Sequence, residues 1–178
     1  PVLVDPDDAS FLSAKDRILG LVHKGEARAY PLKIMDWHEV VNDRIGGDGI
    51  AITYCPLCLT GIAFDTGSDG PRTFGVSGLL YNSNVLLYDR ESESLWSQLA
   101  MQAVTGKEKG TRLEAIPLQH TTWAAWREQH PDTKVLSLDT GFNRDYGHNP
   151  YTGYATSREL YFPLSASSPR FHPKEQVL

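Results

Sequence analysis

The chain has 178 residues, 40% hydrophobic and 22% charged, which excludes a disordered protein and fits one globular domain over residues 1–178. Its formal net charge is -5, and its 17 lysine and arginine residues form no run, so nucleic-acid binding is excluded. No apolar segment approaches the ~20 residues that a membrane-spanning helix requires.

The first part of the chain predicts a hairpin followed by a helix. Residues 18–22 and 27–30 have strand-like composition and flank a short turn, as in a β-hairpin. Over residues 32–44 the apolar side chains recur at helical spacing, and the glycines that follow end the pattern. His38 lies on the apolar stripe of this helix, so we expect its side chain to point inward.

The rest of the chain predicts mainly short strands. Residues 50–54 form an apolar strand that leads directly into the turn Cys55-Pro56-Leu57-Cys58. Further strands are expected at residues 62–64, 73–76, 84–88, 95–98, 111–116 and 134–138. A second helix is expected over residues 121–130, and residues 139–157 predict a long ordered loop. The sum is an α+β fold: a β-rich single domain of short, mostly antiparallel strands with two main helices and a long ordered C-terminal loop region.

Both ends of the chain have features of a longer precursor. The opening residues PVLVDPDD contain neither an initiator methionine nor a signal peptide, so we expect an export signal to have preceded them. The last residues, 176–178, predict the start of a strand. Residues 173–178 also resemble residues 14–19, so a second copy of the opening hairpin is expected to follow.

The two cysteines of the chain are the most informative feature of the sequence. They lie three positions apart, at Cys55 and Cys58, and so cannot form a long-range disulfide. A Cys-x-x-Cys pair is a local device that serves metal binding or redox chemistry.

Several motifs surround this pair. The first three are WHE at residues 37–39, TYCPLC at residues 53–58 and FGVSGLLYNSN at residues 74–84. Further along the chain are YDR at 88–90, ESLWSQ at 93–98, TTW at 121–123, RDY at 144–146 and PY at 150–151. With these motifs the chain resembles the bacterial and archaeal family called domain of unknown function 3179, from about residue 25 to the end.

The resemblance implies an exported protein, periplasmic or secreted, and leaves the chemistry open. One position departs from the family pattern, because Leu59 follows the second cysteine where the family has a glycine. We expect this change to alter the local turn without removing a ligand.

Our first hypothesis is a mononuclear copper site held by Cys55, Cys58 and His38. Two thiolates on one turn can reach the same ion, and sulfur ligands select copper(I), zinc or iron. Three ligands fall short of the four of structural zinc, which favours copper over the alternatives zinc and iron. Such a site would serve electron transfer, copper handling or a metal-dependent reaction. Three further residues are candidates for a fourth ligand: Met35, Glu39 and His148.

Two other hypotheses remain open. The cysteine pair can cycle between dithiol and disulfide, which would make the protein a thiol–disulfide oxidoreductase. Thioredoxin-like pairs begin a helix, however, whereas the residues after Cys58 favour a strand, and this weakens the redox hypothesis. The third hypothesis is a non-catalytic binding module in which the pair is only a structural clip.

A set of polar and aromatic residues completes the candidate site. We expect them to line a pocket or to surround the metal ligands, although a buried structural hydrogen-bond network explains them equally well. They are Glu39, Tyr81, Asn82, Asn84, Asp89, Trp96, Gln98, Arg144 and Asp145.

Overall fold

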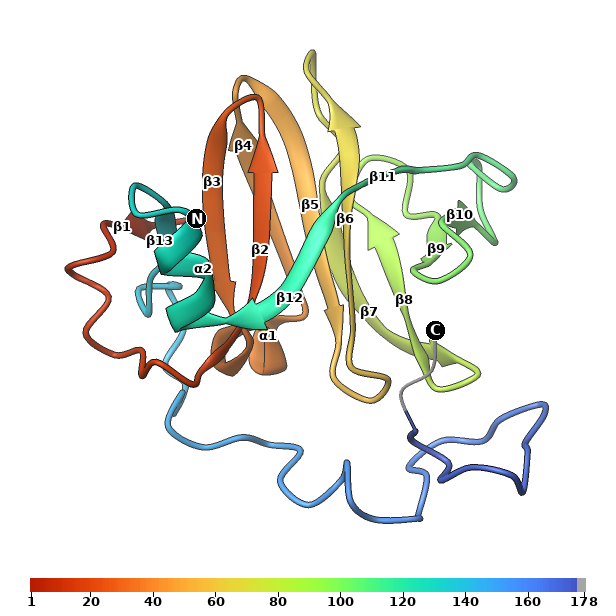
Figure 1. Ribbon diagram of the computed structural model, residues 1–178. Helices are drawn as coiled ribbons and strands as arrows, with labels where there is room; N and C mark the ends of the chain where they lie inside the picture. Colours follow the sequence, from red (N-terminus) through yellow and green to blue (C-terminus); the bar gives the residue numbers. More distant parts are fainter. Residues whose placement is uncertain (176–178) are drawn as a thin grey trace.

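The computed structural model describes residues 1–175, which form thirteen strands and two short helices (Figure 1). The strands are short and pair antiparallel in all but one case, which confirms the predicted β-rich α+β fold. The strand expected at residues 176–178, and with it the second hairpin copy, lies outside the described residues. Within residues 1–175 the structure contains no helix long and apolar enough to cross a membrane.

The first of three sheets contains the predicted N-terminal hairpin. Its strand order is β1 (Leu3–Val4), β13 (Lys134–Leu136), β3 (Glu26–Pro31), β2 (Arg17–His23) and β12 (Leu118–Thr122). Helix α2 (Trp123–Gln129) packs on this sheet, and the Thr122 hydroxyl caps its first turn by accepting a hydrogen bond from Ala125 N.

The second and third sheets have four strands each. The second has the order β11 (Glu114–Ile116), β6 (Thr60–Gly67), β5 (Asp48–Cys55) and β4 (Val40–Ile45). The third has the order β10 (Gln102–Ala103), β9 (Leu95–Ser97), β8 (Asn84–Asp89) and β7 (Phe74–Tyr81). In Figure 1 the second sheet lies between the other two, so both of its faces are covered.

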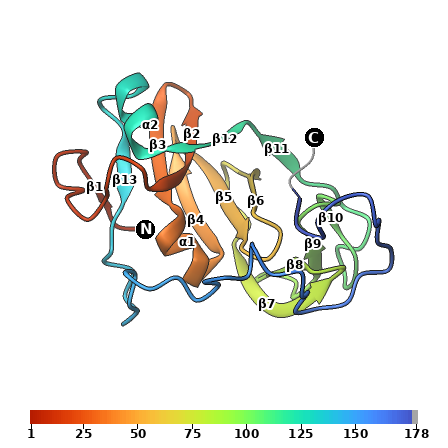
Figure 2. The ribbon, with the colours of Figure 1, turned by 60° about the horizontal axis from the view of Figure 1, so that its bottom comes forward.

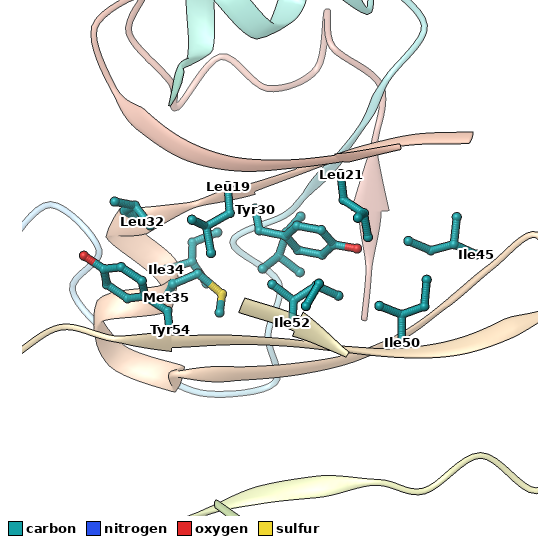
Figure 3. Close-up of a cluster of buried hydrophobic side chains, with 12 residues drawn as sticks. Leu19, Leu21, Tyr30, Leu32, Ile34, Met35, Ile45, Ile50, Ile52 and Tyr54 are labelled. Atoms are coloured by element: carbon teal, nitrogen blue, oxygen red, sulfur yellow. The ribbon is translucent and has the colours of Figure 1, made fainter. Parts of the chain in front are cut away.

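Strand β5 is the centre of the core because it is buried along its whole length. Ile50, Ile52 and Tyr54 point to the first sheet, where they pack with residues of β2, β3 and α1 (Figure 3). The alternate residues Ala51 and Cys55 point to the third sheet. A strand with two buried faces reads as a continuous apolar run, which is why the sequence identified it.

The helix predicted over residues 32–44 is wrong in its second half. Helix α1 spans Leu32–His38 and is followed by strand β4, Val40–Ile45. Glu39 ends the helix in the left-handed conformation, with φ 57°. The β-branched residues after it pair with β5, and the tertiary pairing overrides the helical spacing of the apolar residues.

Gly20 of β2 lies directly beneath the indole ring of Trp126. A methyl group at this position would meet the ring at 2.4 Å. Because Trp126 is fully buried, we expect Gly20→Ala to lower the free energy of unfolding by about 1–3 kcal/mol. Urea denaturation measures the loss. The loss caused by Gly20→Ala should be smaller when Trp126→Phe is also present. If the losses of the two single variants simply add in the double variant, the Trp126 ring is not what the added methyl group meets.

Residues 137–175 contain no helix or strand and run below the ends of the central strands (Figure 2). This C-terminal segment is tied to α1, where Asn149 Nδ2 donates to Asp36 Oδ2 at 2.9 Å. It is tied to the turn between β7 and β8, where Ser83 Oγ donates to Phe162 O at 2.8 Å. The segment therefore passes over the β5–β6 turn that carries the cysteines.

Candidate functional site

The cysteine turn joins the two central strands. Cys55 is the last residue of β5, Thr60 is the first of β6, and Cys58 N donates to Cys55 O at 3.3 Å within the turn. Leu59 adopts a left-handed conformation with φ 52°. Glycine adopts this conformation without strain, which explains the glycine in the family pattern, while Leu59 packs its side chain on the core beside β2 and β5.

The two thiols have different environments. Cys55 is 1% exposed, and its sulfur lies 3.7 Å from Ser83 O. Cys58 is half-buried, and its sulfur accepts a hydrogen bond from Asn84 Nδ2 at 3.2 Å. Both cysteines are free thiols.

These environments move the two pKa values in opposite directions. The interaction with the neighbouring Cys55 thiol lowers the pKa of Cys58 to about 6, and the hydrogen bond from the Asn84 amide adds to the effect. The same interaction between the two thiols, together with burial, raises the pKa of Cys55 far above its ordinary value. Near neutral pH the pair therefore carries one negative charge, and the hydrogen bond from the Asn84 amide favours the Cys58 sulfur as its place.

The Asn84 amide is held in place by Gln98. Asn84 Nδ2 also donates to Gln98 Oε1 at 2.8 Å, and Gln98 Nε2 donates to Thr53 Oγ1 at 2.9 Å and to Thr60 O at 3.1 Å. Thr53 and Thr60 belong to the strands on either side of the turn, whereas Asn84 begins β8 and Gln98 directly follows β9 in the third sheet. The structure thus places Asn84 and Gln98, both predicted site residues, beside the Cys58 sulfur.

We expect Asn84→Ala to raise the pKa of Cys58. The variant removes a hydrogen bond to the thiolate worth about 1 kcal/mol, so the rise should be about one pH unit. The pH dependence of Cys58 alkylation by iodoacetamide measures it. Arg112→Ala, which changes an exposed residue of another loop, is the control and should leave the curve unchanged. An unshifted curve in Asn84→Ala would mean that the amide does not stabilise the thiolate.

His38 is not placed beside the cysteines. It is the last residue of α1, and its Nε2 lies 2.6 Å from the Tyr146 hydroxyl, with the Phe142 ring also packed against it. Burial, with a smaller contribution from Arg144, lowers its pKa. Within residues 1–175 no three His, Cys, Asp or Glu side chains are arranged to hold one metal ion. The copper site with His38 therefore stays a prediction.

The three candidates for a fourth metal ligand are also dispersed. Met35 is fully buried in the core beside β2 and β5, and the backbone oxygen of His148 accepts a hydrogen bond from Trp37 Nε1. Glu39 lines the smaller cavity together with Cys55, and His148 lines the larger cleft together with Cys58. Burial, and to a lesser degree the charge of Cys58, raises the pKa of Glu39 to about 7.

The predicted residues Asp89 and Trp96 form a separate network. Asp89 is at the opposite end of β8 from Asn84 and accepts hydrogen bonds from Trp96 Nε1 at 2.7 Å and from Ser92 Oγ. Arg72 lies over the Trp96 ring, 4.7 Å from its centroid. Trp96 packs in the same hydrophobic cluster as Cys55, but its polar atom faces Asp89. This network supports the third sheet and does not contact the sulfurs.

The four remaining predicted residues lie around the site. Tyr81 is exposed, and Asn82 Oδ1 accepts a hydrogen bond from Ser165 N of the C-terminal segment. Arg144 lies over the Trp37 ring, and Asp145 Oδ1 accepts a hydrogen bond from Gly147 N. Asn82 thus helps to hold the segment over the site, and Arg144 and Asp145 stabilise the segment where it meets α1.

Two cavities flank the cysteine turn. A cleft of about 730 Å³ is lined by Cys58, and a smaller cavity of about 330 Å³ is lined by Cys55. Both are closed on one side by Tyr151 of the C-terminal segment, whose pKa burial raises to about 12. The sequence marked this segment as aromatic-rich but did not connect Tyr151 with the turn, because no local pattern shows which strands the segment crosses.

The fold and the site define a β-rich α+β protein with a coupled thiol pair on the turn between two central strands. A family model described as "Protein of unknown function (DUF3179)" matches residues 1–178, the whole chain. The chain therefore belongs to this family. Neither the curated proteins nor the solved structures contain a match to it.

Proposed function

We propose that the protein is a thiol–disulfide oxidoreductase that reacts through Cys58 and Cys55. The observation that carries the proposal is the asymmetry of the pair. The Cys58 sulfur faces a cleft and is stabilised as a thiolate by the Asn84 amide and the Cys55 thiol, with a pKa of about 6. A thiolate is the nucleophile of disulfide exchange. In thioredoxin-like pairs the cysteines begin a helix, whereas here hydrogen bonds within the site stabilise the thiolate.

The exchange takes place in two steps. The Cys58 thiolate attacks one sulfur of a substrate disulfide, so that a mixed disulfide forms and one substrate thiolate leaves. That thiolate takes the proton of Cys55, whose sulfur then attacks Cys58 and expels the second substrate thiolate. The protein gains a Cys55–Cys58 disulfide, and the substrate gains two electrons. A cellular dithiol would return the pair to the reduced state.

Reduced protein and a small disulfide, bis(2-hydroxyethyl) disulfide, test the proposal. Two thiols should be lost per chain, and the intact mass should fall by two hydrogen atoms without a lasting adduct. Thiols that stay unreacted, or an adduct that is never resolved, would contradict the proposal.

A second candidate is a copper(I) site formed by the two sulfurs alone. It is favoured by their position, because they adjoin one another and the ionised sulfur lines an open cleft. Zinc and iron fit less well, since the described residues supply two ligands where these ions take about four. Elemental analysis after incubation with copper(I) tests this candidate. One equivalent that is lost in Cys55→Ser supports it, and metal-free protein contradicts it.

We also propose that the protein acts outside the cytoplasm, as the family resemblance implies. A dithiol pair there meets substrates that hold disulfides.

The structural-clip hypothesis predicts that the double variant Cys55→Ser with Cys58→Ser loses stability, while the oxidoreductase proposal predicts that it loses exchange and keeps its fold. Urea denaturation and the exchange assay on the same variant separate the two.

A further inference from the structure

The cysteine turn is the wall between the two cavities. Pro56 and Leu57, the residues between the cysteines, line both the cleft of about 730 Å³ and the cavity of about 330 Å³. The cysteines on either side of them face different spaces, Cys58 the cleft and Cys55 the smaller cavity. A molecule that reaches the sulfurs therefore lies against this wall, with room on both sides.

The smaller cavity is lined mostly by apolar side chains. It is lined by aliphatic residues of β7 and β8 and by aromatic residues of the C-terminal segment, with Glu39 as its charged member. Leu79 stands at its rim, 53% exposed. Strand β7 presents this side chain through an irregularity, since its pairing with β8 is interrupted between Val76 and Leu80. An interruption of this kind aims a side chain away from the regular strand face.

The larger cleft has charged side chains in its lining. Arg17, Lys33 and Asp36 line it from the first sheet and α1, and Lys174 lines it from the C-terminal segment. The site as a whole therefore consists of a space with mostly apolar lining and a larger space with charged side chains in its lining, and the cysteine turn separates the two. A small disulfide occupies only one part of such a site, whereas a chain with different side chains along its length fills all of it.

We propose that the substrate is an extended polypeptide segment that contains a disulfide, with the apolar side chain next to its reacting cysteine bound in the smaller cavity against Leu79. This inference rests on the proposed oxidoreductase function and deepens it. The apolar side chain loses contact with water in the cavity, which gives the site its preference. The polar cleft accepts the chain on the other side of the turn, and Tyr151 spans both spaces.

Two synthetic peptides test the inference. Each contains one cysteine in a mixed disulfide with thionitrobenzoate, and they differ only in the adjacent residue, leucine in one and aspartate in the other. Release of the chromophore gives the rate with reduced protein. We expect the leucine peptide to react about tenfold faster, the factor that corresponds to burying part of one aliphatic side chain.

Substitutions in the smaller cavity test whether the preference for the leucine peptide arises there. Leu79→Asp should bring the ratio of the two rates close to one. Val22→Asp is the matched control, because Val22 is an aliphatic residue of β2 that is 43% exposed and lies outside both cavities, and it should leave the ratio unchanged. Phe162→Ser changes the opposite wall of the same cavity and should also lower the ratio, which gives a second measurement if Leu79→Asp does not fold.

Each outcome has one meaning. Equal rates for the two wild-type peptides, or a ratio that persists in both cavity variants, would overturn the polypeptide inference. A protein that oxidises with bis(2-hydroxyethyl) disulfide but with neither peptide would also overturn it, while the oxidoreductase function would stand. A protein that reacts with none of the three disulfides would overturn both.

Discussion

Replacing Cys58 with serine is expected to abolish thiol–disulfide exchange, and replacing Cys55 with serine is expected to stop the reaction at the mixed disulfide. In the proposed reaction Cys58 carries the attacking thiolate, because its pKa is about 6, whereas the pKa of Cys55 is raised. Without Cys55 no second sulfur is present to release the substrate. Mass spectrometry after incubation with a disulfide distinguishes the two variants, since only Cys55→Ser should carry the substrate adduct.

The pair of variants is its own control, because each retains one cysteine and the same turn. Both should keep the wild-type near-ultraviolet circular dichroism spectrum. The reverse pattern, in which Cys58→Ser is trapped and Cys55→Ser is inert, would show that the buried thiol is the nucleophile. The claim that the hydrogen bond from the Asn84 amide makes Cys58 the thiolate would then be wrong.

Replacing Asp89 with alanine is expected to lower the free energy of unfolding by about 3–5 kcal/mol, because it leaves buried polar groups without their partner. Asp89 is fully buried and accepts hydrogen bonds from Trp96 Nε1 and from Ser92. Arg72 Nη1, 3.7 Å away, would lose the negative charge that balances it. Urea denaturation measures the effect.

The same variant tests whether the Asp89 network belongs to the site. Because the network has no contact with the sulfurs, Asp89→Ala should leave the pKa of Cys58 unchanged in conditions where the protein stays folded. Asp69→Ala, at an exposed aspartate, is the matched control and should change stability by less than about 0.5 kcal/mol. A stability loss below 1 kcal/mol for Asp89→Ala would contradict the structural role.

The pH dependence of Asp89 follows from its hydrogen bonds. Burial alone raises the pKa of this carboxyl, but the hydrogen bonds from Trp96 and Ser92 outweigh it, and the pKa is lowered. A carboxyl whose folded pKa is depressed stabilises the protein above its unfolded pKa, and the stabilisation is lost as the pH falls through the folded value. The contribution of Asp89 is therefore present at neutral pH and disappears in acid.

Local sequence patterns predicted the strands better than the first helix. The buried strand β5 and the N-terminal hairpin were predictable because apolar runs and turns are local signals. Residues 39–44 were predicted to continue the helix because their apolar spacing fits one, and the left-handed Glu39 that separates helix from strand has no sequence signature. Strand β12 was missed for a related reason, since its partner β2 is about a hundred residues away in the sequence.

The candidate site was predictable in part. Cys55 and Cys58 are recognisable from their spacing, and Asn84 and Gln98 belong to two of the motifs noted in the sequence. The distinction between Asn84, which touches a sulfur, and Asp89, which does not, depends on which end of β8 meets the turn. That depends on how the second and third sheets stack. The position of His38 depends instead on where the C-terminal segment crosses α1, because His38 meets Tyr146 of that segment.

The rate of the first alkylation of reduced wild-type protein, measured from pH 4 to pH 9, tests the central claim most directly. Iodoacetamide reacts with the thiolate only, and peptide mapping identifies the modified cysteine. We predict that the first adduct forms on Cys58 with a midpoint near its pKa of about 6, while Cys55 stays unmodified. A midpoint near the ordinary thiol value of about 8.5, or a first adduct on Cys55, would contradict the account.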